Sequence, residues 1–108
     1  MAVTDDDLVG KALGRAQGAY AALVDRYQRP VFSLIVRLMG DPAVAAELAQ
    51  DTFLKAFRRL ESFDRQRGFS PWLLRIAHNT AVDALRRGRL ETALIEEEPD
   101  ARRDEHRL

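Results

Sequence analysis

Apolar residues recur at three- and four-residue steps along most of this chain, the spacing that places side chains on one face of an α-helix. The longest such stripe covers residues 20–38 and consists of Tyr20, Leu23, Val24, Tyr27, Val31, Leu34, Ile35 and Leu38. Pro30 falls inside this stripe. Because proline lacks an amide hydrogen and crowds the preceding turn, we expect Pro30 to kink the helix or to divide it in two.

A second stripe follows a helix boundary at residues 40–42. Gly40 suits the end of one helix, Asp41 can cap the free amides of the next, and Pro42 fits the first helical position. The apolar positions that follow are Ala45, Leu48, Ala49, Thr52, Phe53, Ala56, Phe57 and Leu60. They predict a long helix with one buried face.

A third helix is predicted after a polar loop at residues 63–69. We expect Ser70 to cap it and Pro71 to occupy its first position. Its apolar face consists of Leu73, Ile76, Ala77, Thr80 and Ala84, widened by Leu74, Ala81 and Leu85. At about 100° per residue, the opposite face carries Arg75, His78, Asn79, Val82, Asp83, Arg86 and Arg89. One face is therefore predicted to pack on the core, and the other is free to bind.

A short helix is predicted before these, capped by Thr4 and ending between Gly14 and Gln17. No strand pattern interrupts the helical ones, so the prediction is an all-α bundle of about four to five helices. With 108 residues we expect one domain, over residues 1–89. Residues 90–108 are acidic and contain few apolar anchors, which predicts a frayed helix end followed by a mobile linker.

The net charge of zero hides a strong segregation of charge along the chain. Residues 1–54 have a balance of −2, residues 55–89 have nine basic against three acidic residues, or +6, and residues 90–108 have a balance of −4. A local +6 on helical sequence is typical of a nucleic-acid contact. The chain has no cysteine, signal peptide or 18-residue apolar run, so we expect a cytoplasmic protein.

The chain offers little chemistry for an enzyme. It has no glycine-rich phosphate loop, no nucleophile elbow and no metal-ligand spacing, so we expect no catalysis, no cofactor and no metal. Its two histidines, His78 and His106, lie in separate segments. For His78 two interpretations stay open: a solvated polar position on an exposed helix face, or a contact to a base or phosphate.

Three segments together resemble region 2 of bacterial sigma factors of the small extracytoplasmic-function (ECF) group. They read AYAALVDRYQRPVFSLIVRLMGD, AAELAQDTFLKAFRRLESFD and FSPWLLRIAHNTAVDALRR, at residues 19–41, 45–64 and 69–87, and the resemblance as a whole covers nearly all of residues 8–87. The resemblance implies a transcription-initiation factor that binds core RNA polymerase and recognises and holds open the promoter −10 element. An alternative from the residues alone is a helical interaction module whose basic face binds an acidic protein partner.

The resemblance also implies a docking surface for the clamp helices of the largest polymerase subunits. It assigns this role to the polar side of the helix after residue 42, at Glu47, Gln50, Asp51 and Arg58. A row of carboxylates and an amide can pair with arginines of a coiled coil. An ordinary solvated helix surface is the alternative explanation of the same residues.

For the non-template strand of the −10 element, the resemblance implies a loop that captures a flipped-out base. It assigns this role to Phe63, Asp64, Arg65, Gln66, Arg67, Phe69 and Ser70. Alternatives stay open within this set, because Arg65 and Arg67 can simply hold phosphates and the two phenylalanines can pack under the loop. Trp72 is expected to be mainly structural.

Along the following helix, the resemblance places Arg75, His78, Asn79 and Arg86 toward DNA. Asn79 is our preferred specificity residue there, because its amide both donates and accepts hydrogen bonds. The family also implies an anti-sigma factor as a partner. We further expect that the second helical domain, which reads the −35 element in this group, is missing from these 108 residues.

Overall fold

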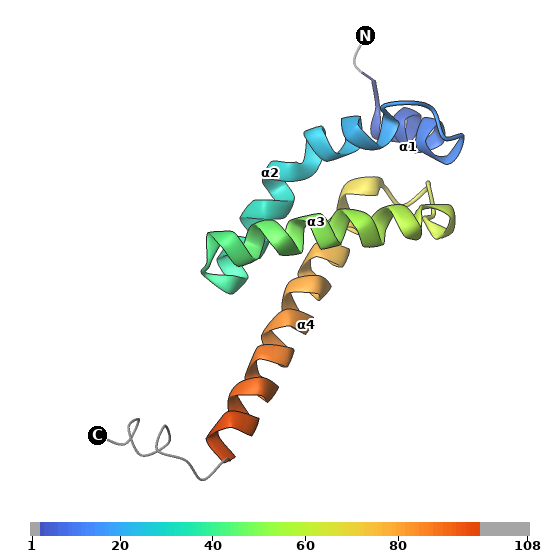
Figure 1. Cartoon of the computed structure of the whole chain (residues 1–108). Helices are drawn as coiled ribbons and strands as arrows, with labels where there is room; N and C mark the ends of the chain where they lie inside the picture. The colour runs from blue at the N-terminus through green and yellow to red at the C-terminus, as the bar shows by residue number, and fades with distance from the viewer. Residues whose placement is uncertain (1–2, 98–108) are drawn as a thin grey trace.

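The computed structural model describes residues 3–97, and every regular element within that range is helical. The elements are α1 (Asp5–Leu13), α2 (Ala19–Met39), α3 (Pro42–Arg58), the 3-10 turn η1 (Leu60–Ser62) and α4 (Phe69–Glu97). Figure 1 shows α1 beside the start of α2, α3 crossing the middle of the molecule, and α4 projecting away from the other helices. The predicted all-α bundle is confirmed.

Local sequence explains most of the helix ends. Thr4 caps α1 with a reciprocal capping box to Asp7, and α1 ends at Gly14 as expected. Gly40 closes α2 in the left-handed conformation, with φ of 75°. Asp41 then caps α3 by accepting hydrogen bonds from the amides of Ala43 (2.9 Å) and Val44 (3.4 Å). The boundary predicted at residues 40–42 is therefore confirmed.

Pro30 does not divide α2, which is a single helix of 21 residues. Its axis changes direction part-way along, as Figure 1 shows. Pro30 is exposed. The hydrogen bond that a proline removes therefore falls on a side of the helix that is open to water, where its loss costs least.

The expected start of the last helix was wrong by two residues. α4 begins at Phe69, so Ser70 is its second residue and cannot be its cap, and Pro71 is its third. Gly68 precedes the helix with φ of 83°, a conformation that favours glycine. This residue lets the chain turn into the helix before Ser70, while Pro71 still lies among the first four positions, whose amides have no helical partner.

The core lies where α2, α3 and α4 meet. Its fully buried large side chains include Leu23 and Ile35 from α2 and Leu73 from α4. The two buried threonines, Thr52 and Thr80, donate their hydroxyls to the carbonyls four residues earlier, at 2.8 Å and 2.7 Å. These hydrogen bonds allow polar side chains to be buried where α3 packs on α4.

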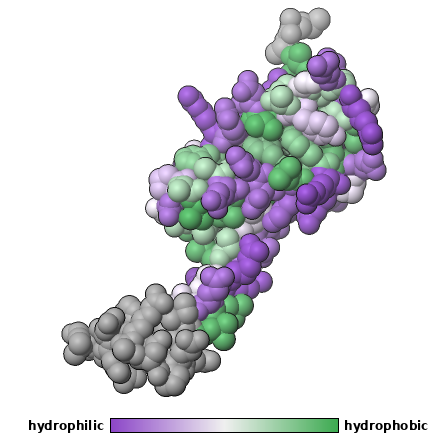
Figure 2. All heavy atoms as spheres, viewed as in Figure 1, coloured by the Kyte–Doolittle hydropathy of each residue, from purple (hydrophilic) through white to green (hydrophobic). Residues whose placement is uncertain are grey.

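α4 continues without a break through residue 90 to Glu97. Leu90 and Leu94 are 60% and 64% exposed, and Figure 2 shows hydrophobic surface on this projecting end of the helix. The predicted domain limit at residue 89 stays a prediction, and the predicted mobile linker lies mostly outside the described residues. Within residues 3–97, no helix combines the length and apolar character needed to cross a membrane.

Candidate nucleic-acid interface

The loop between η1 and α4 is organised around Asp64. One carboxylate oxygen of Asp64 accepts a hydrogen bond from the amide of Gln66 (3.0 Å), and its carbonyl accepts one from the amide of Arg67 (3.0 Å). Such local contacts are the usual reason for aspartate at the start of a turn. The loop therefore has a defined backbone shape.

An aromatic cluster lies under this loop. Phe63 and Phe69 are only 8% and 3% exposed, and their ring centroids are 5.7 Å apart. The Trp72 ring lies 4.9 Å from Phe63 and 5.7 Å from Phe69, and Tyr27 of α2 lies 5.4 Å from Phe69. Of the two roles left open for the phenylalanines, the structure supports packing under the loop for Phe69. Phe63 packs there as well.

A pocket of about 450 Å³ opens between the loop and the first turns of α4. Its lining consists of Ser62, Phe63, Asp64, Arg67, Gly68, Pro71, Trp72 and Arg75. Four of the predicted nucleic-acid residues therefore meet at one site: Phe63, Asp64, Arg67 and Arg75.

Sequence reasoning missed part of this lining. Ser62, Gly68 and Pro71 were not predicted as site residues, and Trp72 was expected to be mainly structural. One available signal was helical spacing, because residues 71, 72 and 75 share a helix face. That spacing alone does not show that the loop folds over the same face.

The pocket combines aromatic surface with charge. Arg67 Nε lies 3.6 Å from a carboxylate oxygen of Asp64, and the two side chains are 81% and 56% exposed. An ion pair this long and this exposed is weak, so both groups are free to bind a ligand. Arg75 is also exposed. The site can therefore bind a planar ring, hydrogen-bond its edge and hold a nearby phosphate.

Besides Phe69, three other predicted loop residues do not line the pocket. Arg65 turns away from it and forms an ion pair with Asp6 of α1, with Nε 2.7 Å from a carboxylate oxygen. The hydrogen bond from Arg65 holds the pKa of the Asp6 carboxyl below its ordinary value, and the same contact raises the pKa of Arg65. Gln66 is exposed, and Ser70 is half-buried in the first turn of α4.

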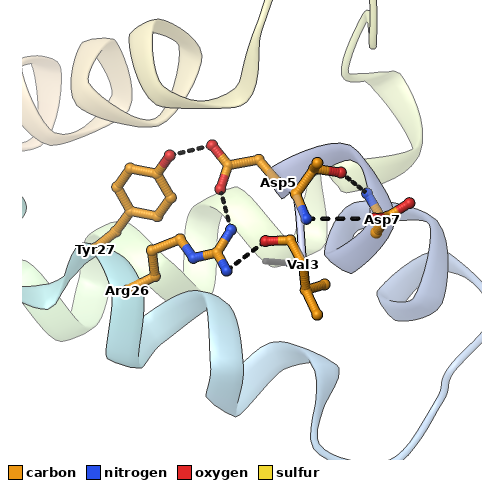
Figure 3. A network of polar contacts seen from close by, with 6 residues as sticks. Val3, Asp5, Asp7, Arg26 and Tyr27 are labelled. Atoms are coloured by element: carbon orange, nitrogen blue, oxygen red, sulfur yellow. Dashed lines mark hydrogen bonds and ion pairs between the residues drawn. The ribbon is translucent and has the colours of Figure 1, made fainter. Parts of the chain in front are cut away.

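Beside the aromatic cluster, a polar network joins α1 to α2, as Figure 3 shows. Asp5 accepts hydrogen bonds from Arg26 Nη1 (2.9 Å) and from the hydroxyl of Tyr27, and Arg26 Nη2 donates to the carbonyl of Val3 (2.6 Å). Burial, followed by the contact with Asp5, raises the pKa of Tyr27 to about 12, although a hydrogen bond with Ser70 acts in the opposite direction. This network fixes the helix against which Arg65 packs.

The predicted residues of α4 extend the basic surface away from the pocket. His78, Asn79 and Arg86 are exposed, as is Arg75. His78 and Asn79 lie one helical turn beyond Arg75, and Arg86 lies about three turns beyond it, or roughly 16 Å along the helix. They form one stripe with Arg75 but do not enter the pocket.

The predicted docking residues lie on a different surface. Glu47, Gln50, Asp51 and Arg58 are all exposed on α3. Gln50 also borders a groove of about 440 Å³ between α2 and α3, whose lining consists of Val24, Gln28, Arg29, Phe32, Ser33, Ala46, Ala49, Gln50 and Phe53. Sequence reasoning missed the wall that α2 contributes to this groove.

Comparison with known proteins decides the family. The family model for sigma-70 region 2 matches residues 23–91 of the chain. The chain belongs to the sigma-70 region 2 family. The match covers most of α2, all of α3 and the loop, and most of α4, and it leaves α1 outside.

Relatives of this region 2 chain include ECF sigma factors. It is 39% identical over 71 residues to the ECF RNA polymerase sigma factor SigW of Bacillus subtilis, covering 66% of this chain and 38% of that protein. It is 41% identical over 81 residues to the RNA polymerase sigma-H factor of Pseudomonas aeruginosa, covering 75% and 42%. The chain thus spans about two fifths of the length of these curated relatives. The resemblance to ECF region 2 is confirmed.

A solved structure gives the same result for the fold. An engineered region 2 of sigmaE, determined by NMR in complex with GTAAAA, is similar with a TM-score of 0.73 and 42% sequence identity. The similarity covers 79% of this chain and 90% of that one.

Proposed function

We propose that this chain is the region 2 domain of an ECF sigma factor that binds core RNA polymerase and recognises and holds open the promoter −10 element. The observation that carries the proposal is the pocket between the loop and α4, where Phe63 and Trp72 lie beside Asp64, Arg67 and Arg75. We propose a non-enzymatic role for the domain. Because this role is carried out at promoters, we also propose that the domain is cytoplasmic and that an anti-sigma factor can bind it.

The pocket suits a base that has left the DNA stack. Extruding a base costs a few kcal/mol, and a pocket recovers that energy by covering the ring and bonding its edge. Phe63 and Trp72 offer ring surface, while Asp64 accepts and Arg67 donates hydrogen bonds. Arg75, with the stripe that continues to Arg86, supplies cations along the strand. The similarity to an engineered region 2 in complex with GTAAAA supports a nucleic-acid ligand.

We propose that the polymerase docks on α3 and on the groove between α2 and α3. Exposed carboxylates at Glu47 and Asp51 and the amide of Gln50 offer charge-assisted hydrogen bonds to a basic helix. Phe32 and Phe53 in the groove add apolar area. The interface then has an apolar centre and a polar rim.

The two surfaces are connected by one rigid helix. Residues 47–51 and the start of η1 at Leu60 are separated by about 10 residues of α3, or roughly 15 Å. Docking of α3 on polymerase therefore fixes the position of the loop that follows it. This arrangement places the pocket at a set distance from the polymerase surface.

The DNA-binding part is tested by fluorescence anisotropy with this chain and labelled single strands. The probe is the oligodeoxynucleotide GTAAAA, compared with six strands that each carry one changed base. At one position we expect the changed base to weaken binding, relative to GTAAAA, by roughly 1–3 kcal/mol, or about 5- to 150-fold. Discrimination at that position should fall in Arg67→Ala but not in Arg37→Ala, which removes an exposed arginine from the last turn of α2. Equal affinity for all seven strands with a steep salt dependence would favour an acidic protein partner instead.

The docking part is tested by pull-down of core RNA polymerase. The double variant Glu47→Lys and Asp51→Lys should bind at least about tenfold more weakly, because like charges then face each other across the interface. Glu61→Lys reverses the charge of one acid on η1, away from the groove, and should bind as the unaltered chain does. Unchanged binding of the double variant would exclude this surface.

A further inference from the structure

Arg65 joins the loop to α1 through three hydrogen bonds. Nε and Nη2 donate to the two carboxylate oxygens of Asp6 at 2.7 Å and 2.9 Å, and Nη2 also donates to the Asp6 carbonyl at 3.1 Å. The partners are 59 residues apart in the sequence. A planar guanidinium held by both carboxylate oxygens has a fixed orientation as well as a fixed distance.

Gly10 provides the space for this contact. A Cβ atom at Gly10 would lie 3.1 Å from Arg65 Nη2 and 3.7 Å from its Cζ. Gly10 lies four residues after Asp6, so both residues occupy the same face of α1. The guanidinium therefore rests against the helix backbone, over a residue that has no side chain.

α1 is itself fixed to the core. Val9 and Ala12 are fully buried, and the Asp5 network joins the first turn of α1 to α2. The loop is thus held at three places: the buried rings of Phe63 and Phe69 at its two ends, and Arg65 in its middle. The middle contact is a direct hydrogen-bonded contact with α1.

We propose that Asp6 is a positioning residue that, through Arg65, holds the loop in the shape that places Asp64 and Arg67 at the pocket. This inference rests on the proposed DNA-binding function of the pocket. It moves Arg65 from the set of DNA contacts to the support of the loop. Through Asp6, α1 then contributes to base discrimination, although α1 lies outside the segment matched by the family model.

The expected consequence is a loss of discrimination without a loss of fold. Exposed ion pairs add little to global stability, so breaking this one leaves the core intact. Arg67 and Arg75 still attract phosphates, and overall affinity for single strands changes little. The groups that bond the base edge lose their fixed positions, and discrimination at the captured base declines.

The first test measures the loop without DNA. NMR relaxation of the full chain is compared with Asp6→Ala, Arg65→Ala and the double variant, with Asp25→Ala as an exposed-acid control on α2. We expect order parameters of the loop amides to fall from the rigid range near 0.85 toward about 0.6 in the first three, while amides of α3 stay unchanged. Unchanged loop order parameters in Asp6→Ala would overturn the proposal.

The second test measures the ratio of affinities for the preferred strand and a strand changed at the discriminated base. We expect this ratio to fall by about fivefold in each single variant and by no more in the double variant, because both changes break the same contact. An additive double variant, or uniform weakening for all strands in Arg65→Ala alone, would assign Arg65 to a phosphate and overturn the proposal. If the unaltered chain does not discriminate at all, the proposed function fails, and the relaxation measurements still decide the positioning role.

Discussion

Replacing Phe69 with alanine separates packing from base contact at the aromatic cluster. The Phe69 side chain is 3% exposed, and its ring has three aromatic neighbours, Tyr27, Phe63 and Trp72, at 5.4–5.7 Å. Removing a buried phenylalanine typically costs about 3–5 kcal/mol, part of which comes from lost ring contacts. A domain of this size is stable by roughly 5–15 kcal/mol, so the variant should fold but with much less stability.

The measurement is urea unfolding followed by circular dichroism. With an expected loss of about 4 kcal/mol and an m value of about 2 kcal/mol per molar, the midpoint should fall by about 2 M. Phe57→Ala is a matched control, because Phe57 is only half-buried and contacts Tyr20 and Phe53 instead. It should lose less stability than Phe69→Ala.

Oligonucleotide binding gives the contrasting result. Once corrected for the folded fraction, the affinity of Phe69→Ala for GTAAAA should change less than about tenfold, or 1.4 kcal/mol, because Phe69 does not line the pocket. The packing role would be refuted by a variant that loses less than about 1 kcal/mol of stability and yet loses binding more than tenfold.

Two further predictions concern charge. Arg75→Ala should reduce the slope of log affinity against log salt by about 0.7 for a single strand, because Arg75 is an exposed cation at the pocket; an unchanged slope in anisotropy titrations would mean that it holds no phosphate. The pKa of Tyr27 is raised from 10.0 to about 12, so its protonated hydroxyl stabilises the fold fully below pH 10.0, and this stabilisation is lost as the pH rises toward 12. Urea unfolding across that range should show a smaller decline in Tyr27→Phe, and equal declines in the two proteins would contradict the assignment.

The two boundaries read from sequence illustrate when local signals suffice. At residues 40–42, glycine, aspartate and proline each act on the nearest turn, and the structure has a helix end and a helix start there. At residues 68–71 the signal was ambiguous, because Ser70 and Pro71 suit a helix start but Gly68 permits an earlier one. Packing of Phe69 against Tyr27 favours the earlier start, and that contact joins segments far apart in the sequence.

The candidate site shows the same division. The family resemblance named Asp64, Arg67 and Arg75, which share the pocket, but it also named Arg65, which the structure pairs with Asp6. No periodicity connects residues 6 and 65. An exposed arginine can bind a ligand or pair with an acidic residue of another helix. Which of the two it does depends on which segments of the chain lie side by side, and only the folded molecule determines that.

The sequence by itself determined the helices, their buried faces, the segregated positive charge and the family, because these depend on residue spacing and on motifs within short segments. The tertiary structure decided the pocket, the groove between α2 and α3, and the attachment of the loop to α1. Each of these is formed by segments that meet only when the core packs. The local sequence therefore specifies which side chains the loop from Phe63 to Gly68 carries. Its shape depends both on its own turn and on its contact with α1.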